Sequence, residues 1–168
     1  MSKHPLQRRS LLGMASLAVL AGAPWVWASS TRPTPNRPEI EVWKSPTCGC
    51  CHLWVQHLQK NGFEVKTYDL PNTAVKRRAL GLPDHLGSCH TAVVAGYVIE
   101  GHVPAADIRR LLSEKPKALG LTVPGMPIGS PGMDGPEYQG RRDAYDVLLV
   151  TPQLMGGVST RVFQHHPA

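Results

Sequence analysis

Charged residues and aromatic residues are both scarce in this sequence. Asp, Glu, Lys and Arg make up only 18% of the 168 residues and 42% are hydrophobic, which excludes a disordered chain kept open by its charge. Aromatic residues make up 6%, so we expect a mainly aliphatic core. Glycine and proline each occur 16 times, which indicates long loops. The length allows one domain of ordinary size with terminal extensions.

The motifs by which many enzymes are recognised are also missing. The sequence has no Ser-His-Asp order, no phosphate-binding loop and no dinucleotide-binding glycine pattern. Its dense basic run, Lys76 to Arg78, has no aromatic residues between the charges, so no binding of nucleic acid is expected. Any chemistry must therefore come from another constellation of residues.

No apolar run is long enough to span a membrane, but the first 28 residues resemble an export signal. Basic residues, including Arg8 and Arg9, precede an uncharged apolar run of 13 residues at 11–23, where a membrane span needs roughly 20. We predict cleavage after about Ala28, a proline-rich linker at 29–38, a periplasmic location and no membrane contact afterwards. The two adjacent arginines are typical of the twin-arginine export route.

The pattern of apolar residues after the linker predicts alternating strands and helices. The predicted strands are 40–43, 63–68, 92–94 and 97–99, with helices at 47–62, 72–80 and 104–115, and later strands at 145–150 and 158–163. Ten of the 21 residues in 116–136 are Gly or Pro, which predicts a surface loop without regular elements. The order predicts an α/β, thioredoxin-like, three-layer domain at 39–168 with extra C-terminal strands and a long Gly/Pro-rich loop.

Three of the four cysteines lie within four residues, at Cys48, Cys50 and Cys51, where the first strand is expected to meet the first helix. The helix N-terminus favours a thiolate there. One interpretation is a structural pair of disulfides, for example Cys48–Cys51 with Cys50–Cys89, although such close spacing closes almost no loop. A second is a redox pair of Cys48 and Cys51, which leaves Cys50 unexplained. A third is a metal site that uses every sulfur, with Cys89 supplied by a later loop.

A metal held by this sulfur set is expected to be copper rather than zinc. Zinc sites with four cysteines are usually built from two separated pairs, whereas here three cysteines lie together and the fourth is distant. Cu(I) accepts bridging thiolates together with thioether and imidazole ligands. Met126, Met133 and His90 are candidates for such additional ligands. His52 adjoins Cys51, whereas His57 and His85 have weaker claims, and His102 is expected in a turn before Val103.

Several motifs together resemble the periplasmic CopG-like copper-resistance proteins, a metal-binding family long catalogued as a domain of unknown function. The resemblance runs from about Ile40 to Phe163. The motifs are WKSPTCGCC at 43–51, GSCHT at 87–91, VIEGHVP at 98–104, VPGMP at 123–127 and GSPGM at 129–133.

The resemblance implies a thioredoxin-like fold whose four cysteines, Cys48, Cys50, Cys51 and Cys89, hold one or more Cu(I) ions. Met126, Met133 and His90 would lie around the cluster. The implied role is copper resistance, by sequestration or by interconversion of Cu(I) and Cu(II), and the implied partners are copper ions and other periplasmic copper-handling proteins. Such interconversion would make the protein a copper-dependent oxidoreductase. The alternative is a periplasmic thiol-disulfide oxidoreductase that acts through Cys48 and Cys51.

Overall fold

The structure is a computed structural model that describes residues 37–168. The predicted signal peptide and nearly all of the predicted linker lie outside the described residues. Two short 3-10 helices, Asp84–Leu86 and Pro136–Tyr138, accompany the main elements. The main elements are β1 (Glu39–Lys44), α1 (Gly49–Lys60), β2 (Glu64–Asp69), α2 (Thr73–Ala79), β3 (His90–Val94), β4 (Tyr97–Glu100), α3 (Ala105–Glu114), β5 (Gly120–Thr122), β6 (Tyr145–Pro152) and β7 (Val158–His166).

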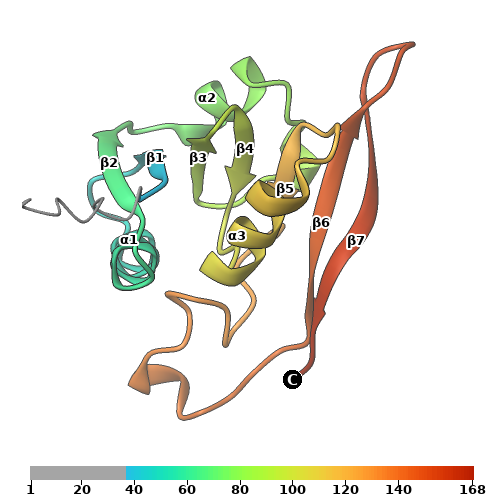
Figure 1. Cartoon of the computed structure of the whole chain (residues 1–168). Coiled ribbons are helices and arrows are strands. Elements are labelled where there is room, and N and C mark those ends of the chain that lie inside the picture. The colour runs from blue at the N-terminus through green and yellow to red at the C-terminus, as the bar shows by residue number, and fades with distance from the viewer. Residues whose placement is uncertain (1–36) are drawn as a thin grey trace, which may run out of the picture. The chain divides into compact units, whose positions relative to one another are not determined.

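All seven strands join one sheet in the order β2-β1-β3-β4-β5-β6-β7 (Figure 1). The pairs β1–β2 and β4–β5 are parallel, and the other neighbouring pairs are antiparallel. The mixed α/β class and the extension of the sheet by two C-terminal strands are therefore confirmed. The closer likeness to thioredoxin stays a prediction.

The helices cover both faces of the sheet. Along β1, Ile40 and Val42 are fully buried in the core formed with α1 and α3, whereas Trp43 points the other way, under the Lys76 ammonium of α2. This alternation follows from the two-residue period of a strand. Figure 1 accordingly shows α2 and α1 on opposite sides of β1 and β3.

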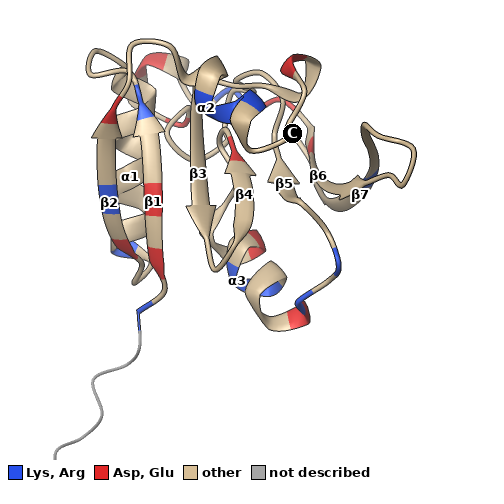
Figure 2. Ribbon diagram, turned by 90° about the horizontal axis from the view of Figure 1, so that it is seen from above, with Lys and Arg blue, Asp and Glu red and all other residues tan. Residues whose placement is uncertain are grey.

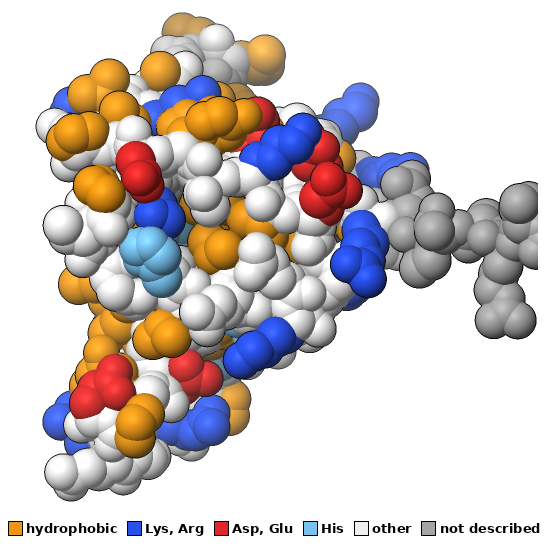
Figure 3. Space-filling view, turned by 90° about the vertical axis from the view of Figure 1, so that its left-hand side faces the viewer, with side chains coloured by type: hydrophobic (Ala, Val, Ile, Leu, Met, Phe, Trp, Pro, Cys, Tyr) orange, Lys and Arg blue, Asp and Glu red, His pale blue; other side chains and the backbone are white. Residues whose placement is uncertain are grey.

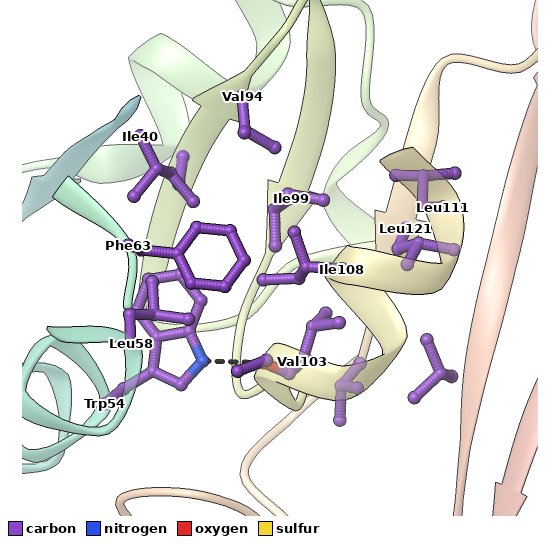
Figure 4. Close-up of a cluster of buried hydrophobic side chains, with 14 of the residues drawn as sticks. Ile40, Trp54, Leu58, Phe63, Val94, Ile99, Val103, Ile108, Leu111 and Leu121 are labelled. Carbon is purple, nitrogen blue, oxygen red and sulfur yellow. Dashed lines mark hydrogen bonds between the residues drawn. The ribbon is translucent and has the colours of Figure 1, made fainter. Parts of the chain in front are cut away.

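The core lies between α1, α3 and the sheet (Figure 4). The predicted helical stripe of Cys51, Trp54, Val55 and Leu58 is buried along α1, as its spacing requires. Trp54 is fully buried, and its indole N–H donates to the Val103 carbonyl at 2.9 Å. This contact fixes the middle of α1 against the chain that follows β4.

The prediction of no regular element in residues 116–136 is wrong, because β5 lies within this segment. Position 120 must be glycine, because a Cβ atom there would lie 1.7 Å from the Val98 carbonyl oxygen of β4. The three residues of β5 are all buried between β4 and β6. Pairing with two neighbouring strands, rather than any local pattern, makes this segment a strand.

The surface is mixed in charge. Both signs are scattered over the ribbon in Figure 2, and on the face in Figure 3 basic side chains are interspersed with acidic and apolar ones. Within residues 37–168, no helix combines the length and the hydropathy needed to cross a bilayer. At the tip of the β6–β7 hairpin, Leu154 and Met155 are exposed.

Candidate metal centre

The four cysteines converge at one end of β1 and β3. Cys48 is the N-cap of α1, Cys50 and Cys51 lie in its first turn, and Cys89 directly precedes β3. The register pairs Lys44 at the end of β1 with His90 at the start of β3, which brings the two cysteine segments together. All four sulfur atoms lie within 4.8 Å of one another.

Two of these cysteines are oxidised and two are free. A disulfide joins Cys48 to Cys51, while Cys50 and Cys89 remain thiols. The Cys50 sulfur lies 3.5 Å from the Cys48 sulfur and 3.8 Å from the Cys89 sulfur. The pair expected from the redox interpretation is thus formed. The second disulfide of the structural interpretation is not.

Cys89 also contacts two imidazoles. Its sulfur lies 3.3 Å from Nδ1 of His90 and 3.2 Å from Nε2 of His102. The other ring nitrogen of His102, Nδ1, donates to the Pro131 carbonyl at 2.8 Å, which leaves Nε2 with a free lone pair directed at the sulfur. Histidines that ligate metals are commonly oriented in this way, through a hydrogen bond from the other nitrogen.

His90 is fully buried, and its ring packs against Trp54 with the centroids 4.3 Å apart. Its Nε2 atom has no hydrogen-bond partner within the described part of the chain. Burial, together with the nearby ring of His102, lowers the pKa of His90 well below its ordinary value. Burial also lowers the pKa of His102. Both rings are therefore neutral near pH 7, the form in which imidazole binds metals.

The environment of Cys89 disfavours an isolated thiolate. Burial, followed by the neighbouring Cys50, raises the pKa of Cys89 to about 12. A buried anion of this kind needs a cation close by. Binding of a metal cation by this sulfur would therefore release a proton.

A buried ion pair supports the cluster from the opposite face of the β3–β4 hairpin. Glu100 is fully buried and accepts hydrogen bonds from the Arg77 guanidinium at 2.9 Å, the Ser88 backbone N–H at 2.7 Å and the Thr91 hydroxyl at 2.6 Å. Burial raises the pKa of Glu100, and these three donors oppose that rise. Ser88 and Thr91 flank Cys89 and His90, so the carboxylate fixes the backbone that carries them.

The Gly/Pro-rich loop closes over the start of α1. A Cβ atom at Gly132, where φ is +87°, would lie 2.6 Å from the Cys50 carbonyl oxygen and 2.9 Å from the backbone nitrogen of Trp54. Only glycine permits this approach and this backbone conformation together. The same loop supplies the Pro131 carbonyl that orients His102.

The two methionines that were predicted as ligands lie in this loop, and their surroundings differ. Met133 is buried next to Gly132, and its sulfur accepts a hydrogen bond from the Tyr138 hydroxyl at 3.6 Å. Met126 is half exposed, directly after Gly125, whose N–H donates to the Gly87 carbonyl. Their roles as ligands stay predictions. His102, by contrast, was expected only in a turn, and the structure places its ring beside Cys89.

Comparisons with known proteins support the same reading of the fold. Two solved structures, both titled copper resistance protein CopG, are similar over most of their length. Form 2 is 41% identical, with a TM-score of 0.69, and the match covers 78% of this chain and 99% of that one. Form 1 is 42% identical, with a TM-score of 0.67, and the match covers 77% and 98%. Residues 86–133 match a family described as a protein of unknown function, DUF411. The search of curated proteins gave no match.

Proposed function

Because the chain belongs to the family of the copper resistance protein CopG, we propose that it is an exported protein that holds copper as Cu(I) and contributes to copper resistance. The observation that carries the proposal is the convergence of four cysteine sulfurs, from two separate segments, within 4.8 Å of one another. Thiolates are soft ligands and select Cu(I). Sulfurs this close together can also be shared between more than one ion.

The proposed ligands are the sulfurs of Cys48, Cys50, Cys51 and Cys89. With the Cys48–Cys51 disulfide formed, only two of them are thiols, so the full set of four thiolates requires reduction of that disulfide. The imidazole of His90 extends the ligand set beside Cys89, as does that of His102.

The thioethers of Met126 and Met133 are proposed as outer ligands. Met133 follows Gly132, which packs against the start of α1, and Met126 follows Gly125, which is hydrogen-bonded to the segment before Cys89. Thioether sulfur is a soft ligand and suits Cu(I).

Resistance would arise by sequestration or by interconversion of Cu(I) and Cu(II). The Cys48–Cys51 pair suits the second route: its two thiols can pass two electrons to two Cu(II) ions, which yields two Cu(I), two protons and the disulfide. The proposed location is the periplasm, after cleavage at about Ala28. The partners would be copper ions and other periplasmic copper-handling proteins, with no nucleic acid and no membrane.

A second candidate function is thiol-disulfide exchange with exported proteins through Cys48 and Cys51. It is favoured by the disulfide between an N-cap cysteine and a cysteine in the first turn of a helix, Cys48 and Cys51. Cys48 is the less buried of the two, as the attacking sulfur of such a pair should be.

The variant Cys89→Ser separates the two functions. We expect the anaerobically reduced variant to lose at least 10- to 100-fold in Cu(I) affinity, measured by competition with a chromophoric Cu(I) chelator, because it lacks one sulfur of the cluster (roughly the effect of disturbing a metal ligand). All four cysteines lie in the cluster, so the control is a change at an exposed serine, Ser113→Ala, which should bind like the wild type. Unchanged Cu(I) affinity together with retained reduction of insulin disulfides would instead favour the oxidoreductase.

A further inference from the structure

The two free thiols of the cluster form a second pair. The sulfurs of Cys50 and Cys89 lie 3.8 Å apart, and both side chains are half-buried. A disulfide needs about 2.05 Å between its sulfurs, and a cysteine sulfur moves by rotation about a single side-chain bond. The two sulfurs therefore have less than about 2 Å to close, and side-chain rotation moves them toward each other.

The surroundings already accommodate one oxidised pair. The Cys50 sulfur lies 3.5 Å from Cys48, whose sulfur is bonded to Cys51, so Cys89 is the free thiol within reach of Cys50. The four sulfurs thus sort into an oxidised pair within the first turn of α1 and a reduced pair between α1 and β3.

We propose that Cys50 and Cys89 form a second disulfide couple, so that the four cysteines together supply four electrons to Cu(II). This inference rests on the proposed copper function, which provides the oxidant. The two thiols lose two electrons and two protons, two Cu(II) ions become two Cu(I), and one sulfur–sulfur bond forms. Counting the Cys48–Cys51 couple as well, four Cu(II) ions become four Cu(I) and two disulfides form.

The second couple gives the site three oxidation levels with different capacities for copper. The fully reduced site has four thiols, the half-oxidised site has Cys50 and Cys89, and the fully oxidised site has none. The last two electrons therefore remove the last thiol ligands and leave only the thioethers and imidazoles proposed above, so the site should hold Cu(I) more weakly. The new bond also joins residues 39 apart, compared with three for Cys48 and Cys51, so it ties α1 to β3.

Counting the Cu(I) produced by the protein tests this inference. Fully reduced, oxygen-free protein is mixed with excess Cu(II) and bicinchoninate, which reports Cu(I) by its colour. We expect about four Cu(I) per chain from the wild type, and about two from Cys50→Ser or Cys89→Ser. The matched control is the double variant Cys48→Ser with Cys51→Ser, which keeps only the proposed couple and should also yield about two.

Peptide mapping of the oxidised wild type provides a readout that does not depend on the folding of any variant. After alkylation of free thiols, we expect a cross-linked pair of peptides that contains Cys50 and Cys89, from protein that is monomeric by non-reducing electrophoresis. A wild-type yield of about two Cu(I), with both thiols alkylated, would overturn the inference.

Oxidation by diamide separates failure of the inference from failure of the proposed function. A Cys50–Cys89 cross-link with diamide but no Cu(I) from Cu(II) would contradict copper reduction and, with it, this use of the couple. Reduction of Cu(II) that stops at about two, with no cross-link from either oxidant, would leave the copper function standing and refute the second couple alone.

Discussion

The β3–β4 hairpin and the residues next to it carry buried polar groups on both faces. The two faces differ in whether those groups have strong hydrogen-bond partners. On the face toward α2, both carboxylate oxygens of Glu100 accept hydrogen bonds, from Arg77 and Ser88 on one and from Thr91 on the other. Arg77 is bonded in addition to Asp84. Among the described polar side-chain atoms of this network, only Nε of Arg77 lacks a partner.

On the face toward α1, the buried groups keep their lone pairs free. Nε2 of His90 has no partner among the described residues, and Nε2 of His102 faces only the sulfur of Cys89. Thiols are weak hydrogen-bond donors, so these contacts recover little of what burial costs. A buried polar group without a strong partner is destabilising unless something else binds it.

The contrast separates support from binding. In the network around Glu100 both carboxylate oxygens are hydrogen-bonded within the protein, and the network holds the residues that flank Cys89 and His90. The cluster beside α1, with atoms that lack strong partners, is the one proposed above to bind copper. Because the two faces share the same two strands, the stability of one sets the geometry of the other. Each can be broken separately.

Breaking the supporting face should have the largest effect. Glu100→Ala leaves the Arg77 guanidinium buried without its main counter-ion, so we expect a loss of about 3–5 kcal/mol in the free energy of unfolding. Urea denaturation of the copper-free protein measures this loss. Copper binding should weaken as well, since the backbone at Cys89 loses its anchor at Ser88.

A double variant provides the control for this prediction. Arg77→Met combined with Glu100→Leu replaces the ion pair by apolar groups, and such replacements are often neutral. We therefore expect it to be more stable than Glu100→Ala alone. A loss below about 1 kcal/mol in Glu100→Ala would mean that the carboxylate is not the support described above.

Breaking the binding face should affect copper more than folding. His102→Ala removes the imidazole beside Cys89, and we expect Cu(I) affinity to fall by about 10- to 100-fold. The copper-free variant should lose only about 1 kcal/mol, for the hydrogen bond to Pro131. Competition with a Cu(I) chelator and urea denaturation measure the two effects.

The control is His85→Ala, which removes an exposed imidazole from the 3-10 helix Asp84–Leu86. It should leave Cu(I) affinity unchanged. If both variants bind copper like the wild type, His102 is a structural residue and the two faces of the hairpin differ less than their hydrogen bonds indicate.

The elements with strong local patterns could be predicted from the sequence. The buried stripe of α1 follows from helical spacing. Asn72 is the N-cap of α2, as predicted, and its side-chain oxygen accepts a hydrogen bond from the Ala74 N–H at 3.0 Å. The β3–β4 turn at Ala95 and Gly96 has positive φ at both residues, as a two-residue hairpin requires. The strand β5 could not be predicted, because three residues of a glycine-rich segment have no period.

The cysteines of the site were predictable because of their density, and His102 was missed because its position depends on strand pairing. A signal for it was available. The predicted hairpin pairs Val94 with Tyr97, and extending that register down both strands places residue 102 opposite Cys89. The hydrogen bond from Gly101 N–H to the His90 carbonyl follows this extension. Extending the strand pairing past the last apolar residues of β3 and β4 would therefore have placed His102 beside Cys89.

A pH dependence of stability also distinguishes the two faces. Burial lowers the pKa of His90 and of His102, so below about pH 6.5 the unfolded chain binds protons that the folded protein excludes. Stability of the copper-free protein should therefore fall as the pH drops from 7.5 to 5.5, by at most about 1.4 kcal/mol per pH unit for each histidine. Urea midpoints measured across this range give the slope. His102→Ala should make it shallower and His85→Ala should not, whereas a flat profile in the wild type would mean that the imidazoles beside Cys89 are not shielded from water.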